Sequence, residues 1–156
     1  MKHEHSYAIT VEWIGNRGPG TSSLDAYSRD HEVRCPGKAT LMGSSDPAFR
    51  GDRSRYNPED LLVASLSACH MLWYLSLCAV KQIVVTSYLD EATGTLVEQA
   101  DGTGKMSLVL LRPVVHLAQG FDVHRAFELH ADAHRMCFIA NSVNFPVLHS
   151  PVIKSI

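Results

Sequence analysis

"NPEDLLVASLSACHMLWYLSLCA", residues 57–79, predicts the central element of this protein, a long apolar helix. Asn57 is a good helix cap and Pro58 suits the first helical position. Two acidic residues follow in the first turn, where the helix dipole favours negative charge. The next five turns are almost wholly apolar, so we expect the helix to be buried on nearly all sides. Cys69 and His70 lie in the middle of this run, and their chemistry needs an explanation.

The composition indicates one globular domain over residues 1–156. Hydrophobic residues make up 46% of the chain and charged residues 19%, which argues against disorder. The formal net charge is -2, with both signs interspersed, so the chain lacks the basic face that a nucleic-acid partner requires. Ser65, Ser67, His70 and Ser76 interrupt the apolar run, which favours a core helix over a membrane span.

The cysteines favour a reduced, cytoplasmic setting. The chain has four of them, far apart and without a Cys-x-x-Cys pair, at Cys35, Cys69, Cys78 and Cys137. The start "MKHEHSYAITVEW" has no apolar signal-peptide core. In such a chain a cysteine is more often reactive or simply buried than part of a structural disulfide.

The rest of the chain alternates between strand patterns and one further helix. Residues 6–14 and 25–34 predict strands, and residues 44–58 form a long polar loop rich in arginine. Residues 82–118 predict more strands, with turns at Gly94 and at 102–104. Residues 122–143 predict a second amphipathic helix capped by Asp122, and residues 145–153 a closing strand or loop. This order predicts an α+β fold with an antiparallel sheet and the helices on one side.

The thiols and imidazoles allow two interpretations from the residues alone. Cys69 and Cys78 are nine residues apart, so they face opposite sides of the helix and cannot pair. On the second helix, His130, His134 and Cys137 share one face. Imidazoles beside a thiol can lower its pKa or bind a metal. The alternative is that these side chains, like Cys69 itself, are ordinary buried groups.

Two segments together resemble a known family. "NPEDLLVASLSACH" (57–70) and "AHRMCFIANSVNFPV" (133–147) resemble the OsmC/Ohr family of osmotically induced and organic hydroperoxide resistance proteins. That family has an Asn-Pro-Glu helix start, a cysteine ten residues after the glutamate and a second cysteine on a later helix. Glu59, Cys69 and Cys137 match this pattern. The residues Cys137-Phe138 lack the proline common in the hydroperoxide resistance branch, so the resemblance is closer to the OsmC-like branch.

The resemblance implies an intertwined α+β homodimer that acts as a thiol-dependent peroxidase on organic hydroperoxides. Cys69 would be the peroxidatic cysteine and Cys137 the resolving one. Glu59 would position an arginine, for which Arg29 is the best match and Arg17 a weaker one. No cofactor or metal is implied; an external dithiol, such as a lipoyl-type one, would reduce the disulfide. The alternative functions are a metal-binding protein and a non-catalytic dimer that binds a small apolar ligand.

Helix geometry limits what Glu59 can do. Ten residues of straight helix rise roughly 15 Å, so Glu59 cannot reach Cys69 of its own chain. If Glu59 acts at the thiol, we expect it to act on the thiol of the partner subunit.

Overall fold

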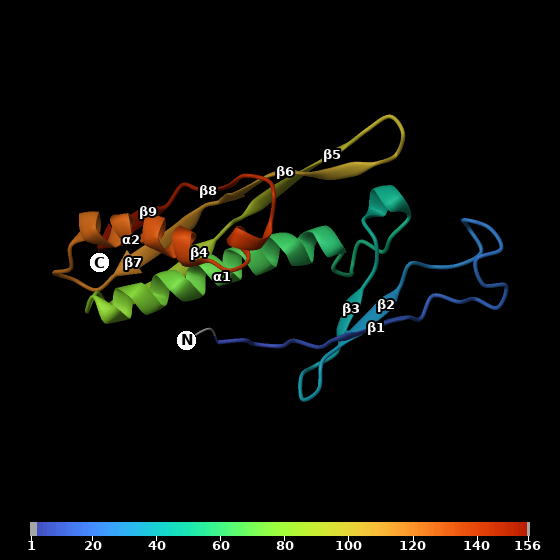
Figure 1. The fold of residues 1–156 in the computed structure, drawn as a ribbon, viewed down its shortest axis with the longest axis horizontal. Coiled ribbons are helices and arrows are strands. Elements are labelled where there is room, and N and C mark those ends of the chain that lie inside the picture. Colours follow the sequence, from blue (N-terminus) through green and yellow to red (C-terminus); the bar gives the residue numbers. More distant parts are fainter. Residues whose placement is uncertain (1–2, 156) are drawn as a thin grey trace. The chain divides into compact units, whose positions relative to one another are not determined.

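A computed structural model describes residues 3–155 and confirms the α+β class (Figure 1). The chain divides into two compact units, Met1–Leu61 and Leu62–Ile156, which are described separately. The single domain over residues 1–156 and the intertwined dimer stay predictions.

The first unit contains a small antiparallel sheet in the order β1-β2-β3. Its strands are β1 (Thr10–Trp13), β2 (His31–Arg34) and β3 (Leu41–Gly43). β1 and β2 are shorter than predicted because the chain turns after β1. There the Asn16 side chain accepts hydrogen bonds from the backbone N–H groups of Gly18 and Gly20, at 2.9 and 3.1 Å. The long polar loop contains a short 3-10 helix, Pro47–Phe49.

Helix α1 (Pro58–Val80) begins as the sequence predicts. The Asp60 N–H donates to the Asn57 side-chain oxygen at 2.7 Å, and the Asn57 N–H donates back to the Asp60 carboxylate at 3.2 Å. This reciprocal cap satisfies two backbone donors and fixes the first turn.

Burial of α1 is narrower than predicted. Its buried residues form one stripe with a spacing of four: Leu66, His70, Tyr74 and Cys78. The prediction of burial on nearly all sides is therefore wrong for a single chain, whose strands and second helix cover only this stripe. Within residues 3–155, α1 is the one helix long and apolar enough to cross a bilayer, a test that core helices of soluble proteins also pass.

The second unit has two mixed sheets, in the orders β4-β7-β9 and β5-β6-β8. The strands are β4 (Val85–Asp90), β5 (Thr93–Glu98), β6 (Gly104–Leu111), β7 (Pro113–Leu117), β8 (Val147–His149) and β9 (Val152–Ser155). β4/β7 and β5/β6 are antiparallel, whereas β8 and β9 add in parallel to β6 and β7. The sheets are thus not purely antiparallel.

Gly94 lies inside β5, opposite Val109, so the predicted turn there is wrong. A Cβ at Gly94 would be 2.6 Å from side-chain atoms of Met106 and Val63. The glycine therefore permits close packing between the strand and these side chains.

Helix α2 (Val123–Met136) starts as predicted and ends earlier. The Asp122 carboxylate accepts from the His124 and Arg125 N–H groups at 2.9 and 3.1 Å. At the other end, the Asn141 side-chain amide donates to the Arg135 carbonyl at 3.0 Å. Cys137 has an extended backbone (ψ 107°) and is the C-cap. Cys137 therefore follows α2 and is not on its face with His130 and His134.

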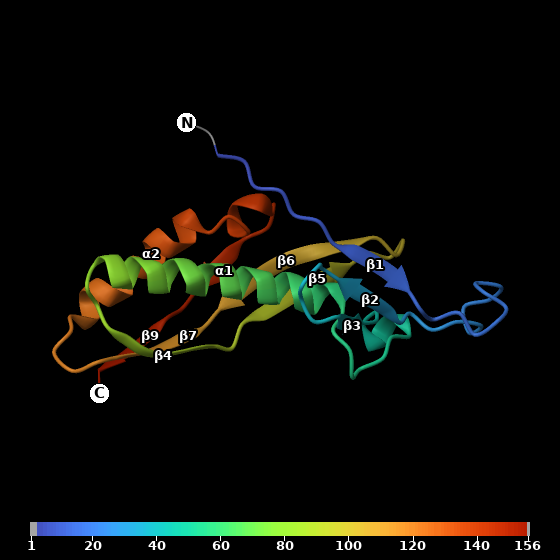
Figure 2. The same ribbon diagram turned by 90° about the horizontal axis from the view of Figure 1, so that it is seen from below.

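A polar cluster lies in the core where α2 packs alongside α1 (Figure 2). His70 Nε2 is 2.9 Å from His130 Nδ1, and the His130 ring stacks on Tyr74 with centroids 3.9 Å apart. His149 from β8 lies 5.4 Å from His70, centroid to centroid. Burial, with neighbouring imidazoles adding to it, lowers the pKa of His70 to about 4 and the pKa of His130 to about 3.

These shifts predict acid lability. In the unfolded chain both imidazoles regain a pKa near 6.5, so that state binds protons that the folded state excludes. The free energy of unfolding should be at its plateau above pH 6.5. It should fall toward pH 4 by up to about 1.4 kcal/mol per pH unit for each imidazole. Urea unfolding from pH 8 to pH 4 measures this, with the exposed His124→Ala variant as control; a flat wild-type profile between pH 6.5 and 4 would contradict it.

Candidate functional site

Two thiols meet between α1 and the end of α2. Cys69 is half-buried on α1, and Cys137 is 1% exposed at the C-cap of α2. The Cys69 thiol is close enough to Cys137 to contribute to the rise in the pKa of Cys137, and neither cysteine is in a disulfide. The structure therefore brings together the two cysteines that the sequence singled out, although they are far apart in the chain.

Burial separates the chemistry of the two thiols. It raises the pKa of Cys137 to about 11, an effect that the Ala140 N–H, donating to Cys137 Sγ at 3.4 Å, only partly offsets. Cys137 is therefore a thiol at neutral pH and needs its proton removed before it can attack. Cys69 is the more accessible of the pair, so it is the thiol that a substrate can reach.

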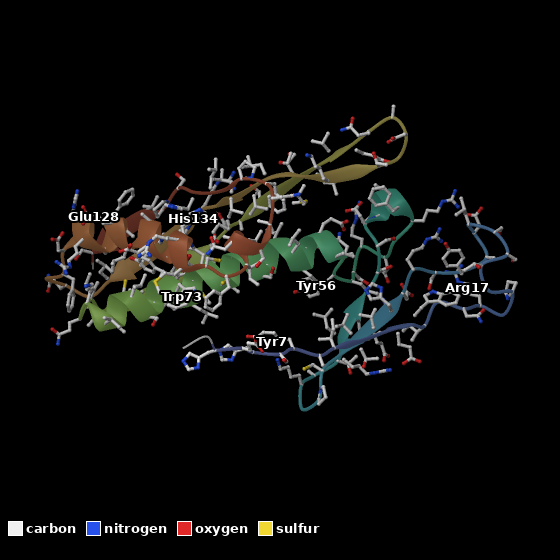
Figure 3. The ribbon with its side chains drawn as sticks, in the orientation of Figure 1. Tyr7, Arg17, Tyr56, Trp73, Glu128 and His134 are labelled. Atoms are coloured by element: carbon white, nitrogen blue, oxygen red, sulfur yellow. The ribbon has the colours of Figure 1, made fainter. Side chains whose placement is uncertain are left out.

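Two aromatic side chains are close to the two cysteines in sequence and contact each other. Trp73 is one turn after Cys69 on α1, and Phe138 directly follows Cys137. Their rings meet edge to face, with centroids 5.5 Å apart, and Phe138 is 67% exposed. Figure 3 labels Trp73 on α1 and His134 on the facing helix. The pairing of Trp73 with Phe138 was missed in the sequence, where the only signal was that each lies near a candidate cysteine.

Cys78 is separated from this pair. It is 1% exposed on the buried stripe of α1, and burial raises its pKa. It also lines an apolar cavity of about 450 Å³ together with Leu75, Gln82 and Ile83. Its environment is that of a small buried hydrophobe.

Arg29 and Glu59 both belong to the first unit, but they do not pair. The Arg29 guanidinium donates to the backbone carbonyls of Leu24 and Tyr27 at 2.7 and 3.0 Å, and lies 4.3 Å from the centre of the Tyr27 ring. Glu59 is half-buried in the first turn of α1. No ion pair joins these two residues in the described part of the chain. Their roles stay predictions.

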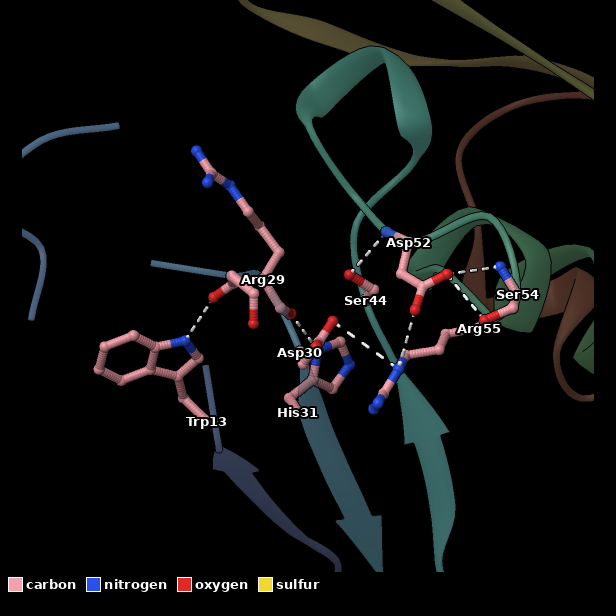
Figure 4. A network of polar contacts seen from close by, with 9 residues as sticks. Trp13, Arg29, Asp30, His31, Ser44, Asp52, Ser54 and Arg55 are labelled. Atoms are coloured by element: carbon pink, nitrogen blue, oxygen red, sulfur yellow. Dashed lines mark hydrogen bonds and ion pairs between the residues drawn. The ribbon is translucent and has the colours of Figure 1, made fainter. Parts of the chain in front are cut away.

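A second arginine, Arg55, is held by two carboxylates (Figure 4). Its Nε lies 3.4 Å from Asp52 and 3.7 Å from Asp30. Hydrogen bonds from Ser54 lower the pKa of Asp52 and help to keep it ionised. The Arg29 side chain points away from this network in Figure 4. The i,i+3 spacing of Asp52 and Arg55 is a sequence signal for their ion pair. No sequence signal indicates the contact between Arg55 and Asp30.

The histidines and cysteines do not form a metal site here. Among residues 3–155, no group of three or more His, Cys, Asp or Glu side chains is arranged to hold a metal ion. His130 Nδ1 is already hydrogen-bonded to His70. Cys137 is the C-cap of α2 and does not share a helical face with His130 and His134. The prediction that the activity needs no metal or cofactor is not tested by this arrangement.

Comparisons with known proteins agree on one family. The model of the OsmC-like protein family matches residues 51–150. An OsmC-like protein of unknown function from Vibrio cholerae is 30% identical, with a TM-score of 0.86 over 96% of this chain and 100% of that one. No curated protein matches the chain.

Two more distant structures share the fold. An organic hydroperoxide resistance protein from Elizabethkingia anophelis is 17% identical, with a TM-score of 0.70 over the full length of both chains. One from Legionella pneumophila is 20% identical, with a TM-score of 0.66 over 97% of this chain and 99% of that one. From the family match and the Vibrio relative, the chain belongs to the OsmC-like protein family.

Proposed function

We propose that this protein is a thiol-dependent peroxidase that reduces organic hydroperoxides to alcohols in the cytoplasm. The observation that carries the proposal is that the thiols of Cys69 and Cys137 lie close enough to influence each other's ionisation. Similarity to proteins named for organic hydroperoxide resistance supports a peroxide-related role. The cytoplasmic setting rests on four cysteines that are all free.

The first step consumes the peroxide. The Cys69 thiolate attacks one peroxide oxygen, and the O–O bond breaks as a sulfur–oxygen bond forms. The alkoxide takes a proton and leaves as an alcohol, so the peroxide is reduced and Cys69 is oxidised to a sulfenic acid. The aromatic pair Trp73 and Phe138 offers an apolar contact for the organic group, which favours alkyl and aryl hydroperoxides over hydrogen peroxide.

The second step protects the oxidised cysteine. The Cys137 sulfur attacks the Cys69 sulfenic acid, water leaves, and a disulfide joins the two sulfurs. An external dithiol then reduces the disulfide by thiol–disulfide exchange and becomes a disulfide itself. Burial of Cys137 suits this order of events, because a protonated, inaccessible thiol is not oxidised directly by the peroxide.

A cation would speed the first step. An ordinary thiol is only a few per cent ionised at pH 7, and a guanidinium stabilises both the thiolate and the charge that develops on the peroxide oxygen. Arg29 is our candidate, and Glu59 our candidate for orienting it.

The surface of α1 supports a homodimer. Leu72 is 63% exposed and Val80 73% exposed, and they lie away from the buried stripe of this apolar helix. A second copy of the chain would cover such surface. In that assembly Glu59 would act at the Cys69 of the partner subunit, as the helix rise requires.

Cys69→Ser should abolish turnover of cumene hydroperoxide, with a loss of at least about 1,000-fold in rate, because the nucleophile is gone. Cys78→Ser is the matched control on the same helix, and it should retain nearly all activity. Peroxide consumption with an excess of dithiol measures both. Equal losses in the two variants would refute the assignment of Cys69, and a wild-type chain that binds the hydroperoxide without consuming it would indicate a non-catalytic binder.

Cys137→Ser should consume about one equivalent of hydroperoxide per chain and then stall. Without a resolving thiol, Cys69 stays a sulfenic acid and goes on to sulfinic acid when more peroxide is added. Intact mass and peptide mapping after one and ten equivalents measure this. A Cys35–Cys69 disulfide in the oxidised wild type would show that Cys137 is not the resolving residue.

Arg29→Ala should lower turnover at pH 7 by about 10- to 100-fold, since both the thiolate and the peroxide oxygen lose a charge partner. Arg29→Lys should restore little, because a point charge does not reproduce the planar fork of a guanidinium. Part of the loss in Arg29→Ala should be recovered at pH 9, where the thiolate forms without help.

Arg55→Ala and the exposed Arg125→Ala serve as comparisons for this series. The Arg125→Ala substitution should leave turnover unchanged. Unchanged turnover in Arg29→Ala together with a loss in Arg55→Ala would transfer the role to Arg55, which two carboxylates already hold in place.

A further inference from the structure

A cluster of four histidines in the second unit, His70, His130, His134 and His149, is not used by the proposed reaction. His70 and His130 are 1% and 0% exposed, and they make the one hydrogen bond between imidazoles in the described residues. His134 and His149 adjoin them, with ring centroids 5.5 Å apart. Buried polar side chains are costly, so a pair placed between two helices calls for a function.

The pair forms a fixed joint between α1 and α2. The rings of His70 and His130 are within 7° of parallel, and their nitrogens are 2.9 Å apart. Tyr74 is one turn after His70 on α1. Its ring stacks on the ring of His130, with an angle of 13° between the two planes. Two residues of α1 therefore hold one residue of α2, one by a directional hydrogen bond and one by packing.

Each cysteine is close in sequence to one histidine of this pair. Cys69 directly precedes His70, a rise of about 1.5 Å along α1. Cys137 is seven residues after His130, two turns further along α2 at its C-cap. A change in the sliding or rotation of α2 against α1 would thus move the two sulfurs relative to each other.

We propose that His70 and His130 are positioning residues, whose mutual hydrogen bond sets the spacing of Cys69 and Cys137 for disulfide formation. This rests on the proposed function, in which that disulfide forms. A disulfide requires Cβ atoms about 3.5–4.5 Å apart and a restricted torsion, so it is sensitive to small shifts between helices. Apolar packing tolerates such shifts better than a hydrogen bond does, because packing has no preferred direction.

The hydrogen bond needs one N–H and one lone pair, which two neutral imidazoles supply. The titratable groups that face the pair are His134 on α2, His149 on β8 and Tyr74 on α1. Cys78 and Tyr88 in turn adjoin Tyr74. None of these is a carboxylate that would stabilise a charged imidazole. The joint is therefore neutral at pH 7.

The test measures the Cys69–Cys137 disulfide without peroxide. Reduced protein is equilibrated in mixtures of reduced and oxidised glutathione at pH 7.5, and the ratio at half-oxidation gives the effective concentration of the two thiols. One glutathione disulfide is reduced to two glutathiones for each protein disulfide formed. Because no peroxide is present, the result does not depend on peroxidase activity.

Two variants at one position separate hydrogen bonding from packing. His130→Phe keeps a ring of similar size against Tyr74 and loses the hydrogen bond. His130→Asn loses the ring and keeps an amide that can bond to His70 Nε2. We expect the effective concentration to fall about tenfold in His130→Phe and to stay within about twofold in His130→Asn. His149→Phe, which changes an imidazole that makes no hydrogen bond to the pair, should match the wild type.

The outcomes distinguish a positioning hydrogen bond from packing alone. A wild-type value in His130→Phe, or a fall in His130→Asn without one in His130→Phe, would overturn the inference and assign the pair to packing alone. If His130→Asn does not fold, His70→Gln supplies the same test from α1, since its amide nitrogen reaches the position of the imidazole Nε2. A wild-type chain that forms no Cys69–Cys137 disulfide overturns the proposed resolving step and this inference together, whereas a normal wild type with unaffected variants overturns only the inference.

Discussion

Helix α1 carries more apolar surface than one chain covers, and Cys69 lies at the margin of the part that is covered. A single chain buries only the stripe from Leu66 to Cys78, while Leu72 and Val80 stay largely exposed. Exposed apolar surface of this kind is covered at low cost by another copy of the chain, because the hydrophobic effect needs no specific partner geometry. Cys69 lies beside the buried stripe and is half-buried. A thiol at such a margin is reachable by an apolar substrate and still sheltered from bulk water.

The two thiols of the pair have the same chemistry and different environments. Cys137 is enclosed, and its raised pKa keeps it protonated at neutral pH. Cys69 is only half-buried, and Trp73, one turn further along α1, contacts the exposed Phe138. In the proposed mechanism burial alone orders the reaction, since the accessible thiol would meet peroxide first and the enclosed thiol would remain for attack on the sulfenic acid. No difference in residue type is needed for this division of roles.

The parts of the fold that depend on neighbours in sequence were predictable. The start of α1 follows from Asn57 and Asp60, and the start of α2 from Asp122, because capping bonds span two or three residues. The end of α2 was not predictable, since the helical pattern continues past Met136 while Asn141 reaches back to close the helix. The contact of Cys69 with Cys137 was expected only from the resemblance to a family. The bond between His70 and His130 joins residues sixty positions apart and left no signal in either helix.

A neutral imidazole pair is a suitable way to join two helices beside Cys69. An apolar pair would pack as well but would allow the helices to slide, and a buried ion pair would need further partners to offset the loss of hydration. It would also place a charge close to Cys69 and change how readily its proton leaves. Two imidazoles give direction without charge, at the cost of stability in acid, where the unfolded chain binds protons that the core excludes. The same burial predicts that the protein is most stable in neutral and alkaline conditions, in which the proposed thiolate reaction would also work best.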